Sequence, residues 1–122
     1  MIIKYKIDGE LTDQNNYFSA ERTNRFAAAT IKKNNTWACE LAARHLKSIG
    51  KTPFKLIIDW FAPNQRKDPD NLAFATKFIL DGLQCAGVID NDGFKNVRGI
   101  NHRTFEVDKI NPRIEITIET VE

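Results

Sequence analysis

The chain of 122 residues has no long hydrophobic run. No stretch approaches the roughly 18 apolar residues that a membrane-spanning helix needs, and the first residues do not have the pattern of a secretory signal peptide. Residues 1–8 alternate between apolar and polar side chains and carry charges, which is typical of a strand. We therefore expect a cytoplasmic protein without a membrane anchor.

The chain also has few cysteines and little net charge. The two cysteines, Cys39 and Cys85, have no metal-ligand spacing around them, and we expect both to be buried free thiols in a reducing compartment. The formal net charge of +2 is too small to indicate a nucleic-acid partner by itself. Repeats, low-complexity tracts and linkers are lacking too. The hydrophobic share of 42% indicates one packed domain over residues 1–122.

Strand-like and helix-like patterns alternate along the chain. We expect strands at residues 2–7, 54–61, 95–107 and 113–121, with an interruption near His102 and the second strand in the centre, covered on both faces. Residues 8–17 are predicted to be a loop. Residues 19–49 are predicted to be helical, with a possible break at 32–36 and Gly50 as the C-cap. The expected fold class is α+β (or α/β), a small mixed sheet of about four strands packed against two or three helices.

The most informative segment is "KDPDNLAFATKFILDGLQCAGVIDND", residues 67–92. It predicts one helix from Asp68, the N-cap, through Pro69 at the first helical position to about residue 86, with Gly87 as the C-cap. Its core-facing stripe consists of Leu72, Ala75, Ile79, Leu83 and Ala86.

Carboxylates lie at both ends of this helix. Asp68 and Asp70 are at its start, and Asp90 and Asp92 are in a tight turn after it. Capping and turn formation explain each acid separately. Together they suit Mg²⁺, which prefers one or two carboxylates with water and substrate phosphate as its other ligands. Such a cation would promote cleavage of a phosphodiester.

One lysine shares the helix with these acids. Lys77 is predicted on the same face as Asp70, from which its side chain would reach a scissile phosphate. Alternatively, Lys77 pairs with Asp81 four residues further on.

Basic residues flank the acidic segment on both sides. We expect eight of them to contact phosphates, with affinity that falls steeply with salt: Arg22, Arg25, Lys32, Lys33, Arg66, Lys67, Lys95 and Arg98. Phe74 and Phe78 flank the acidic face, and they are candidates for a subunit interface or for contact with unstacked bases, with ordinary core packing as the alternative.

Four motifs together resemble the RusA family of Holliday-junction resolvases. They are "NNY" (15–17), "DPDNL" (68–72), "DGLQCAGV" (81–88) and "DND" (90–92). The resemblance implies a homodimer that binds four-way junction DNA and cuts two opposed strands with Mg²⁺, for which Mn²⁺ is a possible substitute. A four-way junction is pseudo-twofold symmetric, which suits such a dimer.

The resemblance also implies the site residues. By position, the catalytic residues are Asp68, Asp70, Lys77 and Asp92, with Asp90 as a possible further metal ligand. The segment before "DGL" is about three residues longer here than in the best-known family member. Counting from Asn71 gives Phe74 as the equivalent of the lysine, whereas counting back from Asp81 gives Lys77, which helical geometry also favours.

Two other functions remain open from the sequence. One is a general metal-dependent nuclease that acts on other branched DNA or on RNA. The other is a non-catalytic protein that binds branched DNA, in which the acids only form caps and turns.

Overall fold

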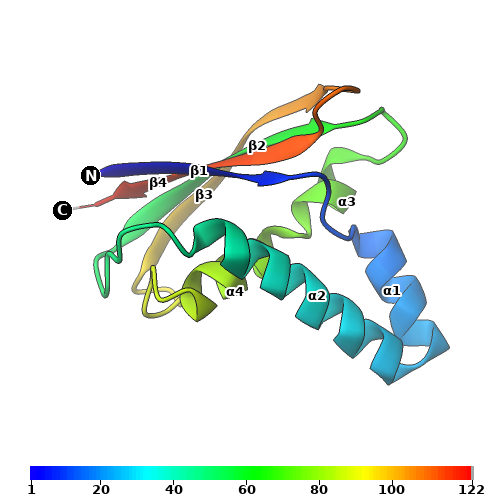
Figure 1. The fold of residues 1–122 in the computed structure, drawn as a ribbon, viewed down its shortest axis with the longest axis horizontal. Helices are drawn as coiled ribbons and strands as arrows, with labels where there is room; N and C mark the ends of the chain where they lie inside the picture. Colours follow the sequence, from blue (N-terminus) through cyan, green and yellow to red (C-terminus); the bar gives the residue numbers. More distant parts are fainter. Residues whose placement is uncertain (122) are drawn as a thin grey trace.

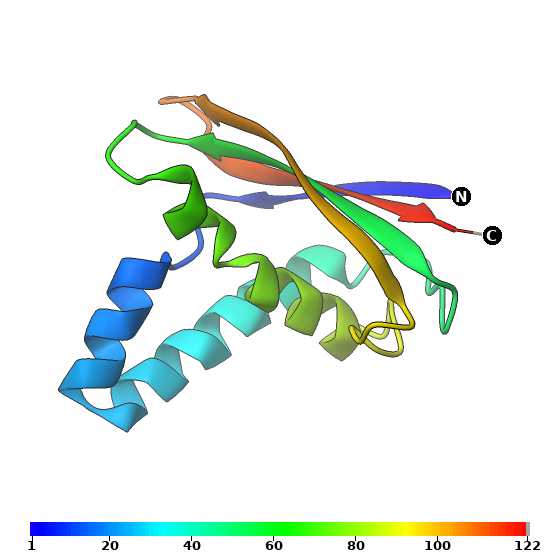
Figure 2. The same ribbon diagram turned by 180° about the vertical axis from the view of Figure 1, so that it is seen from behind.

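In the computed structural model, which describes residues 1–121, a four-stranded mixed sheet has helices on one of its faces only (Figures 1 and 2). The strands are β1 (Ile2–Asp8), β2 (Phe54–Ala62), β3 (Val97–Val107) and β4 (Arg113–Thr120), in the order β1-β4-β2-β3. The helices are α1 (Gln14–Thr23), α2 (Arg25–Ala43), α3 (Pro69–Ala73) and α4 (Thr76–Cys85). The expected α+β class is confirmed.

β2 is an interior strand, as predicted, and shares the middle of the sheet with β4. It pairs in parallel with β3 and antiparallel with β4, and β4 pairs antiparallel with β1. One face of β2 is buried against the helices through Phe54, Leu56, Ile58 and Trp60. The prediction that both faces are covered is wrong, because every helix lies on that one side and the opposite face stays open (Figure 1).

The predicted interruption near His102 is a β-bulge. Ile58 pairs with His102 and Asp59 pairs with Thr104, so Arg103 is left without a partner in the ladder. The bulge directs the Arg103 guanidinium onto the buried Asp59 carboxylate, with Nε–Oδ1 at 3.0 Å and Nη2–Oδ2 at 2.6 Å. β3 therefore continues through the irregularity.

The first helix begins earlier than predicted. Residues 8–17 were expected to be a loop, but α1 starts at Gln14 because Asp13 caps it. The backbone N–H of Asn16 donates to Asp13 Oδ1 at 2.8 Å, and the Asn16 side chain donates to Oδ2 at 2.9 Å. Asp13 is also held from outside the helix, as described below.

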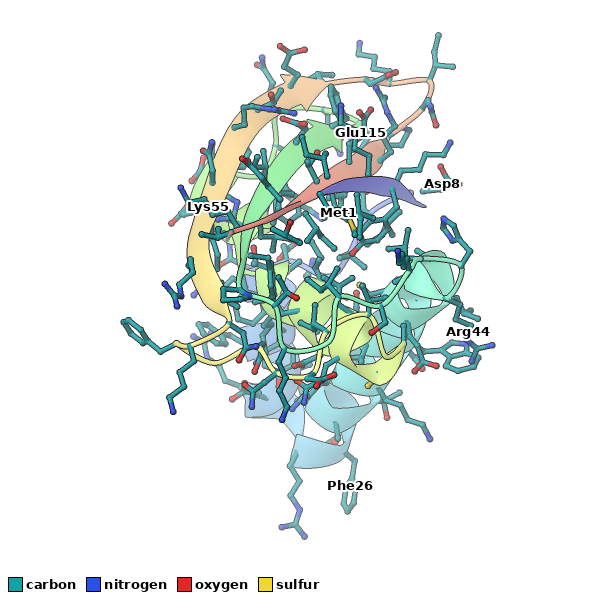
Figure 3. All side chains as sticks on the ribbon, turned by 90° about the vertical axis from the view of Figure 1, so that its left-hand side faces the viewer. Met1, Asp8, Phe26, Arg44, Lys55 and Glu115 are labelled. Carbon is teal, nitrogen blue, oxygen red and sulfur yellow. The ribbon has the colours of Figure 1, made fainter. Side chains whose placement is uncertain are left out.

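The expected break at residues 32–36 is likewise wrong, since these residues lie inside α2. The chain turns instead at Asn24, whose backbone is extended and whose side chain accepts from the Ala27 N–H at 2.7 Å. α1 and α2 thus form a hairpin that projects past the sheet (Figures 1 and 2), and Phe26 points away from the sheet at its end (Figure 3).

Gly50 is not a helix C-cap, because α2 already ends at Ala43. It lies in the loop before β2 with φ +58° and bridges to Ile89. Gly87 does have the predicted role. With φ +76°, it allows the Val88 N–H to donate back to Leu83 O at 3.0 Å after the end of α4.

The helix predicted over residues 68–86 is divided into α3 and α4. At the junction, the Thr76 hydroxyl donates to Ala73 O at 2.6 Å, and the N–H of Phe78 donates three residues back to Ala75 O. Of the predicted core stripe, Ala75, Ile79 and Leu83 are fully buried. The other two members, Leu72 and Ala86, are half-buried and pack against the core.

Phe78 is also fully buried, so its proposed role at an interface or against bases is wrong. Both cysteines are free thiols. Cys39 is buried as expected, but Cys85 is exposed, contrary to expectation. No helix within residues 1–121 combines the length and apolarity needed to cross a membrane.

Candidate functional site

A cleft of about 200 Å³ lies where the parallel strands β2 and β3 end. Trp60 and Ala62 of β2, residues 105–107 of β3 and the loop that leads into α3 line it. Trp60 and Phe105 form an aromatic wall, with their rings nearly parallel at 4° and 6.3 Å between centroids. The carboxyl ends of parallel strands are a common place for ligand sites, because the connecting loops converge there.

Asp68 is on the rim of this cleft and Asp70 follows it in the first turn of α3. Asp68 occupies the predicted N-cap position with Pro69 after it, but its side chain makes no capping hydrogen bond. Both acids are exposed, and neither has an ion-pair partner within residues 1–121. Capping therefore does not account for the Asp68 carboxylate, and both acids are available to a ligand.

The predicted "NNY" motif packs directly against the acidic motif. The backbone N–H of Asn15 donates to Oδ1 of the buried Asn71 at 3.0 Å. Tyr17 packs against Phe74, with ring centroids 5.4 Å apart. Two motifs more than fifty residues apart in the sequence thus form one unit, and α1 fixes the position of the helix that carries Asp70.

Lys77 belongs to the same unit. Its Nζ lies 5.4 Å from the Tyr17 ring centroid and 5.5 Å from that of Phe74. The predicted pair with Asp81 is not formed among the described residues. Asp81 instead lies beside α2, close enough to Cys39 to raise the pKa of its thiol further, after burial itself. The Lys77 ammonium is exposed and rests on aromatic faces, which leaves it free to bind an anion.

Lys67, which we expected to bind phosphate, is already bound. Its Nζ lies 2.8 Å from Asp13 Oδ2 and 3.8 Å from Glu10 Oε1. The Asp13 side chain is only 2% exposed, and burial alone would raise its pKa. Hydrogen bonds from Lys67 and Asn16 outweigh that effect and hold the pKa of Asp13 below its usual value. Lys67 therefore ties the loop before α3 to the cap of α1, and a phosphate contact at Lys67 is left without support.

Lys67→Ala should lower the free energy of unfolding by about 2 kcal/mol, because it leaves the buried Asp13 carboxylate without its cation. This loss should be present at neutral pH and disappear as the pH falls through the lowered pKa of Asp13, where that acid becomes neutral in the folded chain. Urea unfolding at pH 7 and at a series of pH values below 4 measures both.

The neighbouring Arg66 is the matched control, since it is exposed and has no ion-pair partner in the described part of the chain. Arg66→Ala should leave the stability unchanged and flatten the salt dependence of DNA binding by about one unit of slope. If Lys67→Ala flattened the salt dependence of DNA binding and left the free energy of unfolding unchanged, Lys67 would be a phosphate contact rather than the partner of Asp13.

A histidine supports the aromatic wall of the cleft. Trp60 Nε1 donates to His102 Nδ1 at 3.0 Å, so this nitrogen must be unprotonated. Burial lowers the pKa of His102 from its ordinary value near 6.5. The unfolded chain consequently takes up the proton first, and stability falls as the pH drops from about 6.5 toward the lowered pKa.

His102→Gln should remove this part of the acid destabilisation. The measurement is the free energy of unfolding in urea at pH 7.5 and 5.5, with the exposed His45→Gln as the control. We expect the unaltered chain and His45→Gln to lose more stability on acidification than His102→Gln. An equal loss in all three proteins would contradict a neutral, hydrogen-bonded His102.

The other predicted phosphate contacts lie in three places. Arg22 and Arg25 are at the corner between α1 and α2, and Lys32 and Lys33 line a groove along α2. Lys95 lies in the loop that leads into β3, and Arg98 is the second residue of β3. This loop is at the other end of the sheet from the loop between β2 and α3 (Figure 1). All six are exposed, and none has an ion-pair partner among residues 1–121.

The turn acids Asp90 and Asp92 are also at that far end. The Asp90 N–H donates to Gly50 O at 3.0 Å in the loop before β2, whereas Asp68 lies beyond the last residues of β2. The nine residues of β2 separate these positions by about 26 Å. Accordingly, no three His, Cys, Asp or Glu side chains within residues 1–121 are grouped closely enough to hold a metal ion.

Some residues of the cleft were not predicted. Glu106 lines it together with Asp68, and Trp60 and Phe105 form its wall. The sequence placed all three on strands, but it contained no signal that the ends of β2 and β3 lie beside α3. The sequence predicts Asn71 only as part of the "DPDNL" motif, because its hydrogen bond with Asn15 depends on the fold.

Two comparisons with known proteins give no identification, because neither the family models nor the curated protein sequences that were searched match this chain.

Proposed function

We propose that this protein is a metal-dependent endonuclease of the RusA type that cuts four-way DNA junctions. The observation that carries the proposal is the pair of exposed carboxylates of Asp68 and Asp70 beside the cleft. Asp68 makes no capping hydrogen bond, and both acids lie at the start of a helix that Asn71 anchors to α1. Two free carboxylates on a fixed element, with an exposed lysine on the following helix, suit hydrolysis of a phosphodiester.

Asp68 and Asp70 fit a hard divalent cation. Mg²⁺ is usually held by one or two carboxylates while water and substrate phosphate complete its coordination, and Mn²⁺ accepts similar oxygen ligands. When bound, the cation would supply positive charge against the phosphodiester and so stabilise the charge that develops during attack.

Each remaining side chain has a role in binding or positioning. Lys77 would neutralise charge on the phosphate, since its ammonium is exposed and held over Tyr17 and Phe74. Arg66, in the loop before α3, would hold a neighbouring phosphate of the backbone. The six exposed basic residues at the helical corner, on α2 and near β3 would bind the arms of the junction. In the reducing cytoplasm, Cys39 and Cys85 would remain thiols.

The test is incubation of the protein with an end-labelled synthetic four-way junction, with Mg²⁺ or with EDTA, beside a linear duplex of the same sequence. Paired nicks at symmetric positions, found with Mg²⁺ and on the junction only, are expected. Nicking of flaps or RNA with equal efficiency would favour the more general nuclease. Tight junction binding without metal-dependent nicking would support the non-catalytic alternative.

In a homodimer, a turn acid of one copy would act at the centre formed by Asp68 and Asp70 of the other copy. Asp92 and Asp68 lie near opposite ends of β2, whose nine residues span about 26 Å. Asp92 would therefore act at this centre only as Asp92 of the partner subunit. In a C₂ dimer, such an exchange would occur twice, once for each centre.

Asp70→Asn and Asp92→Asn should then each abolish nicking, whereas dimers formed by co-refolding the two variants should regain it. Half of the dimers would be mixed and would contain one intact centre of two, so about a quarter of the normal activity is expected. The mixed dimers should also nick only one strand. If co-refolding restored no nicking, or if Asp92→Asn were active alone, this arrangement would be wrong.

A further inference from the structure

The most exposed large apolar side chain in the described chain is Phe94, at 99%. It lies in the loop between α4 and β3, which is at the other end of the sheet from the loop between β2 and α3 (Figure 1). A phenylalanine there adds nothing to the core, and its exposed ring is unfavourable in water. Exposure alone assigns no role, so the residues around Phe94 decide what it could contact.

The turn that holds Phe94 is built rigidly. The N–H groups of Asn96 and Val97 both donate to Gly93 O at 3.0 Å, which makes Phe94 and Lys95 the central residues of a tight turn. Asn91, which precedes the turn, accepts a hydrogen bond at its Oδ1 from the Gly93 N–H at 2.6 Å.

Asn96 ties the other side of this turn to the body of the protein. Its side chain donates to Lys51 O at 3.1 Å, and its carbonyl accepts from the Phe54 N–H at 2.8 Å. The ring of Phe94 is thus presented on a fixed support, so little conformational entropy would be lost when it binds.

Four basic residues belong to this turn or to the segments next to it. Lys95 shares its turn, Arg98 is held against that turn by a hydrogen bond from Nε to Lys95 O at 3.2 Å, and Lys51 belongs to the adjoining loop. Lys55 is near them, since Gly99 pairs with it across the ladder. None of these four cations is in an ion pair within the described chain. They outnumber the two nearby acids, Asp90 and Asp92, which favours a polyanion as the ligand.

A second exposed apolar residue provides a contrast. Ile110, in the loop between β3 and β4, is 96% exposed. Its loop contains Asp108, which pairs with Arg113, and no comparable group of free cations. An aromatic ring among unpaired cations is the arrangement that stacks on exposed bases of nucleic acids while the cations bind the phosphates.

We infer that Phe94 is a DNA-contacting residue that stacks on an unpaired or partly unstacked base at the branch point of the junction. This inference rests on the proposed DNA-binding function, but it does not require cleavage. The branch point is where bases can be unstacked at least cost, so the contact would contribute selectivity for branched over linear DNA.

The experiment measures binding with Ca²⁺ in place of Mg²⁺ to avoid cleavage, by fluorescence anisotropy on a four-way junction and on a linear duplex. Phe94→Ala should weaken junction binding about tenfold and leave duplex binding unchanged. Phe94→Trp should retain junction binding, and Ile110→Ala should bind both DNAs like the unaltered protein. A junction with 2-aminopurine at its branch point should lose its protein-induced fluorescence change in Phe94→Ala only.

Equal binding by Phe94→Ala and the unaltered protein would overturn the inference, as would an equal loss on junction and duplex. So would dissociation of a dimer by Phe94→Ala in sedimentation, which would make the loop an interface between copies. If the unaltered protein bound but did not nick the junction, only the nuclease activity would fail. If it did not bind the junction, both proposals would fail.

Discussion

An Asp70→Asn protein is expected to bind a four-way junction normally and to lose Mg²⁺-dependent nicking by at least about a thousandfold. Asparagine keeps the shape of the side chain but removes the negative charge that would hold the cation. Asp70 is exposed and has no ion-pair partner among residues 1–121, so the fold should not change. Single-turnover cleavage of a labelled junction measures the loss, and anisotropy measures the binding.

Glu119→Gln is the matched control, because Glu119 is an exposed acid on β4, away from the cleft and without an ion-pair partner in the described part of the chain. It should cleave at the normal rate. If Asp70→Asn cleaved within about tenfold of the unaltered protein, the acids at the start of α3 would be structural. A comparable loss in Glu119→Gln would mean that general charge rather than the site is being measured.

Gly82→Ala should destabilise the protein by about 3 kcal/mol and lower its Tm by about 10 °C. A Cβ at Gly82 would overlap the Cβ of Cys39, and it would lie 2.8 Å from the backbone carbonyl carbon of Cys39 and the nitrogen of Glu40. α2 and α4 therefore approach so closely that only glycine fits. The direction of the change in stability is informative, because glycine to alanine in an ordinary helix stabilises a protein by about 1 kcal/mol.

Thermal unfolding with Gly99→Ala as the control tests this packing. A Cβ at Gly99 would meet only the flexible Lys55 side chain, at 3.6 Å, so a small effect is expected there. An unchanged or higher Tm for Gly82→Ala would contradict the close contact of α2 with α4.

The strands were predictable because their signal is local. Alternating apolar residues identified β2 and β4, the Asp68-Pro69 pair marked the start of α3, and Gly87 marked the end of α4. These features depend only on neighbouring residues.

The errors arose where distant residues decide the local structure. The polar segment around Asn15 was predicted to be a loop, but the ion pair between Asp13 and Lys67 and the hydrogen bond to Asn71 hold it as a helix against α3. The same ion pair gives Lys67 a partner within the chain that the sequence did not indicate. A sequence without an alignment gives no indication of such pairings.

The separation of the four acids could have been anticipated. A helix over residues 68–86 is about 27 Å long, which already places Asp68 and Asp92 at opposite ends. The division into α3 and α4 leaves that separation in place. The family resemblance groups these acids in one site, whereas the helix length indicates that one copy of the chain keeps them apart.

Mn²⁺ binding, followed by electron paramagnetic resonance of the free ion, tests most directly whether Asp68 and Asp70 form a metal centre. The unaltered protein and Glu119→Gln are predicted to bind Mn²⁺ with the same affinity, and Asp68→Asn and Asp70→Asn are predicted to lose that binding. Mg²⁺ should displace the bound Mn²⁺. Equal binding of Mn²⁺ by all four proteins, or by none of them with the junction present, would contradict a metal-dependent nuclease centre at the start of α3.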